Sequence, residues 1–553
     1  MKHVKKILMM AAVMSVASAG RAETPSIIPA PVKMEVQSGS FVLPNGDSAK
    51  IIATPGAEDT AHYLADEVAP ALGYKITIVN NNSSTAGTIL LTTNDAKASL
   101  GEEGYELTVT PANVIIRAPT SAGLFYGVQS LLQLLPPEIL SKTSVSGVKW
   151  EIPCVQIEDQ PRFQWRGMML DVVRHFFNKN EVEEFIDGMA LHKMNRFHWH
   201  LVDDQGWRIE IKKYPQLTKI GAWRKGIDFK LDPKLSKAYG PDGRYGGFYT
   251  QDEIREVIAY AQARHIVIVP EIEMPGHSTA ALMVFPELSC FGGPYNTDLP
   301  GGVFNGEFCT GNEQVYVFLS DVLAEVSDLF PGKYIHIGGD EVPTKNWEKC
   351  PKDQAVIKAE GLKGPKELES YFIRRIEKIV NSHNKTLIGW SEIREGGLAQ
   401  SAVVMDWVGG AVEAASAGHD VVMSPLKYSY FDHYQSTNHT TEPHAIGGYL
   451  PMKEVYEFEP IPAKLDAQYA SHILGAQANI WTEYMPNIGH VEYMAYPRLC
   501  ALCEVVWSPK AARDWNNFST RLPADLRRLD AMGLTYRHDP PQPLPIMKTV
   551  SAN

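Results

Sequence analysis

The sequence contains few cysteines, only 6 in 553 residues, which are too few for a disulfide scaffold in a chain of this length. Cys290 and Cys309 bracket a stretch rich in Gly and Pro, and we expect a disulfide that closes this stretch as one long loop. Cys500 and Cys503 are three residues apart in a helical pattern, so we expect buried core thiols on one helical face rather than a redox pair. No other Cys or Cys/His pair has the spacing of a zinc finger.

Blocks of basic residues are missing after the first six positions, and the net charge of the chain is −12. Nucleic-acid binding proteins usually carry a basic patch that neutralises phosphates. The sequence therefore disfavours a nucleic-acid partner.

Long apolar runs are also missing. The only extended apolar stretch is a short one near the start of the sequence. Lys2, Lys5 and Lys6 precede the apolar residues 7–19, which end in small side chains. This run is too short to span a bilayer comfortably, and the pattern is typical of a secretory signal peptide over residues 1–22. No Cys lies near the expected cleavage point, as a lipoprotein would require. We expect an exported protein, periplasmic or secreted, without a membrane anchor.

The length of the chain predicts two domains. Residues 24–158 mix short β-type runs, such as YELTV and NVIIRA, with helical stretches such as TAHYLADEVAPAL, which predicts a small α+β domain. Residues 159–534 form a second region with a different pattern, and residues 535–553 form a Pro-rich tail.

The second region repeats one pattern eight times: a short apolar run ends in polar or aromatic residues and is followed in several cases by an amphipathic helix. The eight runs are QWRGMMLDV, NRFHWHLVDD, HIVIVPEIEMPGH, KYIHIGGDE, TLIGWSEI, AVVMDWV, DVVMSP and ILGAQANIWTEY. Eight parallel strands with outer helices predict a (β/α)8 barrel. The alternative is an open doubly wound sheet, but no run is followed by a Gly-rich phosphate-binding turn.

In such a barrel, chemistry gathers at the C-terminal ends of the strands. The runs end in these candidate site residues: Arg174, Asp203, His277, Asp340, Glu341, Trp390, Trp407, Trp481 and Glu483.

Asp340 and Glu341 form the densest of these groups. They follow Gly338 and Gly339, which permit the backbone turn that brings two adjacent carboxylates to one pocket. A charged Asp340 is expected to raise the pKa of Glu341 towards neutrality, as a general acid requires. The alternative is a solvated acidic loop.

His198 and His200 lie on one face of another predicted strand and suggest a metal site. A metal-dependent amidohydrolase centre would need further His ligands, and the next motif offers only His277. We therefore expect neutral histidines that support the carboxylates, with no metal and no cofactor.

Six motifs in this order resemble the signature set of glycoside hydrolase family 20, the β-N-acetylhexosaminidases: PRFQWRGMMLDVVRHFF, HWHLVDDQGWRIEI, PEIEMPGH, HIGGDE, GWSE and NIWTEY. The segment EGYELTVTPANVIIRAPTSAGLFYGVQSLLQLL resembles the small α/β domain that precedes the barrel in bacterial members. The resemblance covers nearly the whole chain after residue 22.

The resemblance implies catalytic roles for two residues. Glu341 matches the acid/base, and Asp340 matches the residue that orients the acetamido group of the substrate. Asp203 and His277 match a polar pair behind the acid/base. Glu273 departs from the family pattern, because many relatives carry Asp at this position.

The resemblance also implies a sugar-binding set. Arg174 matches the residue that holds the hydroxyls at sugar carbons 3 and 4, and Glu483 matches a second hydroxyl-binding carboxylate. Tyr430 matches the residue that hydrogen-bonds the acetamido oxygen, with Tyr428 as a rival, and Asp432 follows it in the pocket. The aromatic walls around the acetamido methyl group match Trp390, Trp407 and Trp481.

The activity implied by the resemblance is exo-acting hydrolysis of terminal β-linked GlcNAc or GalNAc, with retention through an oxazolinium intermediate. The partner would be an oligosaccharide or glycoconjugate that ends in such a sugar. The alternatives are a metal-dependent amidohydrolase-type barrel and a barrel that binds sugars without cleaving them.

Overall fold

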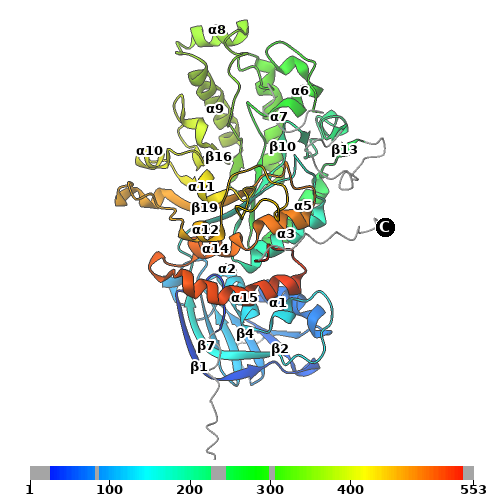
Figure 1. The fold of residues 1–553 in the computed structure, drawn as a ribbon, viewed down its shortest axis with the longest axis vertical. Helices are drawn as coiled ribbons and strands as arrows, with labels where there is room; N and C mark the ends of the chain where they lie inside the picture. The colour runs from blue at the N-terminus through cyan, green and yellow to red at the C-terminus, as the bar shows by residue number, and fades with distance from the viewer. Residues whose placement is uncertain (1–24, 81–85, 226–243, 298–305, 540–553) are drawn as a thin grey trace, which may run out of the picture.

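The computed structural model describes residues 25–80, 86–225, 244–297 and 306–539. The predicted signal peptide and the end of the Pro-rich tail lie outside these residues. Figure 1 shows two parts along the long axis of the molecule, a sheet domain formed by the N-terminal residues and a larger barrel domain above it.

The N-terminal domain is built on a seven-stranded mixed sheet in the order β1-β7-β5-β6-β4-β2-β3. Its strands are β1 (Lys33–Val42), β2 (Lys50–Ala53), β3 (Thr77–Asn80), β4 (Thr88–Thr92), β5 (Tyr105–Val109), β6 (Asn113–Arg117) and β7 (Glu151–Asp159). Helices α1 (Glu58–Leu72) and α2 (Ser121–Leu134) lie on the side of the sheet that faces the barrel (Figure 1). Buried and partly exposed residues alternate along β5 and β6, so one face of the sheet is covered. This is the small α+β domain that the sequence predicts.

The second domain is a closed parallel barrel, and all eight predicted runs form its strands. These strands are β8 (Trp165–Asp171), β9 (Arg196–His200), β14 (Val267–Glu271), β15 (Tyr334–His336), β16 (Thr386–Trp390), β17 (Val403–Asp406), β18 (Val421–Met423) and β19 (Ile473–Ile480). β19 pairs with β8, so the last strand closes the barrel against the first. Since parallel barrel strands are covered on both sides, their apolar runs are nearly continuous.

Helices connect these strands around the outside of the barrel. The longer ones are α3 (Lys179–Leu191), α5 (Gln251–Gln262), α7 (Glu313–Leu329), α9 (Pro365–Ser382), α14 (Arg498–Trp507) and α15 (Trp515–Met532). α3 and α5 begin with capping boxes, Asn178 with Glu181 and Thr250 with Glu253, which satisfy backbone N–H groups of the first turn. Within the described residues, no helix is both long and apolar enough to cross a membrane.

Shorter elements follow several strands and shape the rim of the barrel. The helices are α4 (Gln216–Lys219), α6 (Thr279–Val284), α8 (Pro351–Ala359), α10 (Ala411–Ser416), α11 (Leu426–Ser429), α12 (Met452–Glu457) and α13 (Ile488–Ala495). Two small ribbons pair β10 (Val202–Asp203) with β11 (Gly206–Trp207), and β12 (Trp223–Arg224) with β13 (Tyr245–Gly246).

A buried ion pair joins the two domains. Lys193 Nζ lies 3.0 Å from a carboxylate oxygen of Asp159, and both side chains are fully buried. Asp159 also accepts hydrogen bonds from Tyr105 and from the indole of Trp507. Helix α15 adds to the junction, because Arg521 donates to the carbonyl of Ile27. The domains are therefore joined by a desolvated polar network as well as by apolar packing.

The predicted disulfide between Cys290 and Cys309 is wrong in this structure, where both are free thiols. Cys309 Sγ lies 3.6 Å from the sulfur of Cys350, which follows 41 residues later. The prediction considered only the two cysteines that bracket the loop and missed a third that the fold brings beside them. Cys500 and Cys503 are fully buried in α14, as predicted.

Candidate active site

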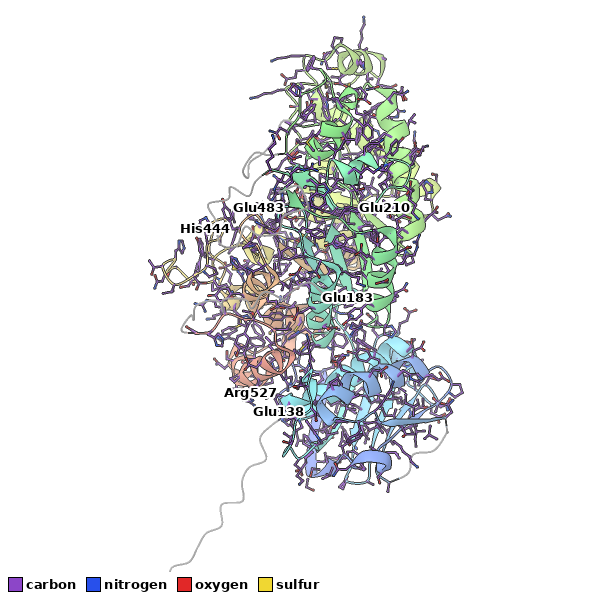
Figure 2. The ribbon with its side chains drawn as sticks, turned by 90° about the vertical axis from the view of Figure 1, so that its right-hand side faces the viewer. Glu138, Glu183, Glu210, His444, Glu483 and Arg527 are labelled. Carbon is purple, nitrogen blue, oxygen red and sulfur yellow. The ribbon has the colours of Figure 1, made fainter. Side chains whose placement is uncertain are left out.

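A cavity of about 340 Å³ opens at the C-terminal ends of the barrel strands. It is lined by Arg174, His277, Asp340, Glu341, Trp407, Leu426, Tyr430, Asp432, His433, Ile446, Gly447, Gly448, Trp481 and Glu483. All the predicted site residues except Asp203 and Trp390 belong to this set. Figure 2 shows Glu483 within the barrel part, far from Glu138 and Arg527 at the junction between the domains.

The two adjacent carboxylates follow a tight turn that requires glycine. Gly338 and Gly339 have φ values of 68° and 87°. A Cβ at Gly338 would lie 1.8 Å from a carboxylate oxygen of Glu273, and the N–H of Gly339 donates to Glu273 at 2.9 Å. Glu341 itself has a φ of 49°, a left-handed conformation that is strained for a residue with a side chain. The turn therefore positions the catalytic candidates and is held from below by Glu273.

The prediction that a charged Asp340 raises the pKa of Glu341 is wrong. A hydrogen bond from His277 lowers the pKa of Glu341. Burial raises the pKa of Asp340 to about 7, with the nearby carboxylates adding to the effect. The prediction assumed a charged Asp340, but the Asp340 side chain is 14% exposed and that of Glu341 is 46% exposed. The more buried carboxyl group pays the larger desolvation penalty and so holds its proton more tightly.

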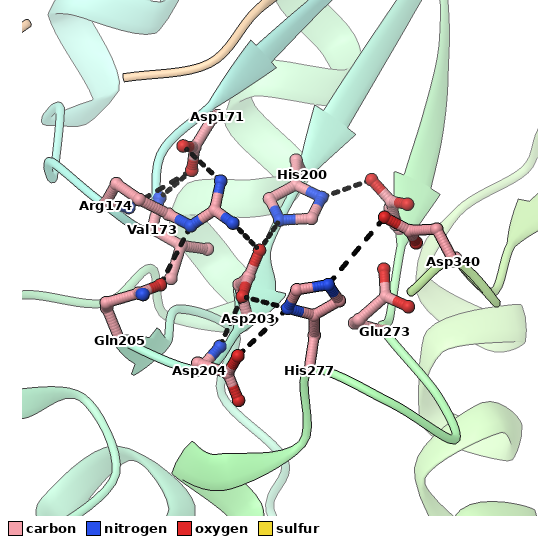
Figure 3. A network of polar contacts seen from close by, with 12 residues as sticks. Asp171, Val173, Arg174, His200, Asp203, Asp204, Gln205, Glu273, His277 and Asp340 are labelled. Atoms are coloured by element: carbon pink, nitrogen blue, oxygen red, sulfur yellow. Dashed lines mark hydrogen bonds and ion pairs between the residues drawn. The ribbon is translucent and has the colours of Figure 1, made fainter. Parts of the chain in front are cut away.

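His277 lies between Asp340 and two further acids, Asp203 and Asp204 (Figure 3). Its Nδ1 lies 2.9 Å from Asp204 and 3.3 Å from Asp203, and its Nε2 lies 3.6 Å from Glu341. Burial alone would lower the pKa of His277, but Asp203 and these hydrogen bonds raise it well above its ordinary value. A charged His277 therefore faces Glu341. Asp204 was missed as a site residue, although the Asp-Asp pair in the sequence could have suggested it.

Arg174 is held by three acidic partners, of which Figure 3 shows Asp171 and Asp203. Its guanidinium lies 2.8 Å from Asp203, 3.2 Å from Asp171 and 3.3 Å from Glu483. It also lies over the ring of Trp481, 5.1 Å from the centroid. Its Nε also donates to Gln205 at 2.8 Å. These contacts fix the direction of the guanidinium and leave at most one of its five N–H groups for an acceptor in the cavity.

Aromatic rings form one wall of the cavity. Trp407 and Tyr430 stack with centroids 5.9 Å apart, and the indole N–H of Trp407 donates to Glu392 at 2.8 Å. The rival Tyr428 instead stacks on Phe458, outside the set of lining residues.

Trp390 is not a lining residue. It is 1% exposed and lies behind Trp481, with centroids 5.8 Å apart. Its indole N–H donates to Glu271 at 2.8 Å. Asp203 also lies behind the wall, between Arg174 and His277.

Comparison with known proteins shows the family. The model of the glycosyl hydrolase family 20 catalytic domain matches residues 163–510, and that of domain 2 of the family matches residues 24–160. The chain belongs to glycosyl hydrolase family 20.

Similar members of family 20 come from several bacteria. A β-hexosaminidase of Porphyromonas gingivalis is 42% identical over 92% of this chain, and the chain spans 64% of that protein. A β-hexosaminidase of Vibrio furnissii is 36% identical, covering 87% of this chain and 76% of its own. The family 20 β-N-acetylhexosaminidase structure from Streptomyces coelicolor has a TM-score of 0.79 and 32% identity, covering 94% of this chain and 98% of that one.

Sequence analysis missed five lining residues: Leu426, His433, Ile446, Gly447 and Gly448. They belong to the long excursion between β18 and β19 rather than to a strand end. Leu426 and Ile446 are 40% and 51% exposed, so they form an apolar lip at the cavity. Isolated exposed apolar residues follow no period, and in this segment the family resemblance extended only to Tyr430 and Asp432.

The two histidines of β9 have different charge states. Burial lowers the pKa of His198 to about 4, which keeps it neutral as predicted. The pKa of His200 is raised to about 10, because Glu271 and Asp203 outweigh the effect of burial. The prediction of a neutral His200 is therefore wrong. Since His200 contacts both Glu271 and Asp203, it is one link in a chain of alternating charges beneath the site.

Proposed function

We propose that this family 20 protein is an exo-acting β-N-acetylhexosaminidase that removes terminal β-linked GlcNAc or GalNAc from oligosaccharides or glycoconjugates. The observation that carries the proposal is the pair Asp340 and Glu341 at the mouth of a small cavity with an aromatic wall. The cavity volume suits one sugar residue with its acetamido group rather than a row of several sugars.

In the proposed mechanism, the substrate supplies the nucleophile. The acetamido oxygen attacks the anomeric carbon while Glu341 gives a proton to the leaving oxygen, and a cyclic oxazolinium ion forms. Water then opens this ion as Glu341 takes a proton back, so the anomeric configuration is retained. His277 lies close enough to Glu341 to stabilise its charged form between these steps.

Asp340 is placed to receive the acetamido N–H. Its Oδ1 is buried and has no hydrogen-bond partner among the described residues, so a substrate N–H would complete its hydrogen bonding. Because its pKa is about 7, Asp340 is partly protonated near neutral pH in the absence of substrate. Donation from the substrate favours the charged form, which then stabilises the positive charge that develops on the oxazolinium ring.

The remaining lining residues have separate roles in the proposal. Trp407, Tyr430 and Trp481 enclose the acetamido group, which brings a weak nucleophile to near-attack geometry. Arg174, which lies over the ring of Trp481, and its partner Glu483 bind ring hydroxyls. Trp390 supports Trp481 from behind rather than touching the sugar.

The proposal is tested with a panel of aryl β-glycosides that differ only in the substituent at carbon 2. We expect turnover of the N-acetylglucosaminide and N-acetylgalactosaminide and almost none of the glucoside. A thiazoline mimic of the oxazolinium ion should bind far more tightly than the product. Equal rates on glucoside and N-acetylglucosaminide would contradict the mechanism.

We also propose that the protein is exported. Support comes from the Lys-rich start and short apolar run within residues 1–22, which are typical of a signal peptide. The amino-terminal sequence of protein recovered outside the cytoplasm would test this, since an unprocessed terminus would contradict it.

A further inference from the structure

Three thiols and one carboxylate meet outside the active site, on the far side of the loops that follow β14 and β15. This thiol cluster consists of Cys290, Cys309, Cys350 and Asp353. The first two flank the excursion after β14, whereas Cys350 and Asp353 lie at the start of α8. The cluster thus joins two loops that carry His277 and Glu341 at their other ends.

The spacing of the side-chain atoms is close to that of a tetrahedral metal site, with one sulfur–oxygen distance shorter than the ideal. Four tetrahedral ligands around zinc place two sulfurs about 3.8 Å apart and a sulfur and an oxygen about 3.6 Å apart, given ordinary Zn–S and Zn–O bonds. Cys309 Sγ lies 3.6 Å from Cys350 Sγ and 3.5 Å from Asp353 Oδ1. Cys290 Sγ lies 3.0 Å from Asp353 Oδ2, and all four ligand atoms lie within 4.8 Å of one another.

The burial of Asp353 is a second, independent observation. Its side chain is fully buried, and its described partners are the thiols of Cys290 and Cys309 and the N–H of Gly311. No Lys or Arg in the described ranges pairs with it. A buried carboxylate with only neutral partners is costly, and a divalent cation at the centre of the cluster would remove that cost.

We propose that the thiol cluster is a structural zinc site with three thiolate ligands and one carboxylate ligand. Four protein ligands close the coordination shell, as in structural rather than catalytic zinc sites. Binding releases the thiol protons, so the site holds zinc only where the thiols are reduced and deprotonated. Cys290 is the partly exposed ligand and offers the entry path for the ion.

Zinc at this position would stabilise the active-site loops. The N–H of Phe308 donates to the carbonyl of Pro275 at 2.9 Å, two residues before His277. The carbonyl of Phe308 accepts from the indole of Trp347, which is fully buried in the loop after Glu341. The zinc ligands Cys309 and Cys350 flank this contact, so the ion would fix the separation of the two loops.

The test compares three forms of the full chain, each reduced, loaded with equimolar Zn²⁺ and passed through a desalting column. The wild-type protein should retain about one zinc per chain by elemental analysis. Cys350→Ser should lower zinc retention about tenfold or more. Serine is a favoured residue at a helix N-cap, where Cys350 lies, so α8 should still begin normally. Cys154→Ser is the matched control, because Cys154 is a buried free thiol in β7 of the other domain.

A spectroscopic measurement on the wild-type chain covers the case in which Cys350→Ser does not fold. Co²⁺ in place of zinc should give the intense visible and near-ultraviolet bands of tetrahedral thiolate coordination. Removal of zinc should lower the melting temperature of the wild type and of Cys154→Ser. The proposal is overturned if the loaded wild type retains no zinc, or if Cys350→Ser retains as much zinc as the wild type. It is also overturned if the native protein contains no zinc and its intact mass is two hydrogens below that of the reduced chain, which would show a disulfide.

Discussion

At the scale of single residues, the two adjacent carboxylates differ in exposure and therefore in role. Glu341 is half exposed beside a charged His277, whereas Asp340 is buried with one oxygen unpaired. The first can exchange protons with a leaving group and with water. The second is suited to hold one N–H group of the substrate.

This difference predicts how two mutants respond to the leaving group. Glu341→Gln removes the proton donor, so activity on a disaccharide should fall severely and activity on an activated aryl glycoside much less. Asp340→Asn keeps the acid but removes the charge opposite the oxazolinium, which should cost about 2 to 4 kcal/mol for both substrates. The measurement is kcat/KM for each mutant on the two substrates. If Asp340→Asn showed the dependence on the leaving group and Glu341→Gln did not, the two role assignments would be reversed.

The raised pKa of Asp340 also predicts a gain in stability when its charge is removed. The folded pKa of about 7 lies above the ordinary value of 3.8, so the unfolded chain releases this proton first. Stability should therefore fall as the pH rises through the window from about 4 to 7. At pH 7.5 we expect Asp340→Asn to be more stable than the wild type by on the order of 1 to 3 kcal/mol.

Thermal unfolding of both proteins at pH 4 and pH 7.5 checks this expectation. The difference between them should be nearly gone at pH 4, where Asp340 is protonated in the folded state and the unfolded carboxyl group is close to its ordinary pKa of 3.8. A mutant that is less stable than the wild type at pH 7.5 would show that the charged carboxylate is stabilising.

At the scale of single elements, the turn after β15 is where glycine is indispensable. Gly338→Ala should destabilise the protein and abolish activity, because a Cβ there collides with Glu273. Gly361→Ala is the matched control, since Gly361 has nearly the same φ, 66°, with nothing near its Cβ position. The control should cost only the backbone term, about 1 to 2 kcal/mol, with normal activity. Urea unfolding measures the stability of both variants, and kcat/KM measures their activity. If the two variants lost equal stability and activity, Glu273 would have to move aside freely.

The strands and their ends were predictable because each strand is a short apolar run followed by a polar residue. Between β18 and β19, the resemblance located Tyr430 and Asp432, but the apolar lip was not predictable, since Leu426 and Ile446 are exposed apolar residues without a period. The pKa order of Asp340 and Glu341 also depends on burial, which only the fold reveals. Cys350 is distant in sequence from Cys290 and Cys309, so no local pattern indicated that the three would meet.

At the scale of the whole molecule, the junction between the domains contains a fully buried ion pair, Lys193 with Asp159. Lys193→Met leaves the carboxylate buried without its cation and should cost about 3 to 5 kcal/mol. Lys142→Met is the control, because its pair with Glu184 is exposed and should contribute at most about 1 kcal/mol.

Denaturant unfolding followed by both tryptophan fluorescence and circular dichroism measures these differences. Combining Lys193→Met with Asp159→Asn should recover part of the loss, since no unpaired charge remains. If Lys193→Met costs no more than Lys142→Met, the junction does not depend on this pair.

The pairing of β19 with β8 has a consequence for how the chain is made. The first barrel strand cannot gain its second neighbour until the last one has been synthesised, because the two are separated by most of the sequence. The hydrogen bond between the carbonyl of Ile27 and Arg521 of α15 likewise cannot form until α15 has been synthesised. The barrel of a nascent chain therefore cannot close until its final segment leaves the ribosome, and the N-terminal sheet, which is complete by Asp159, can form before it.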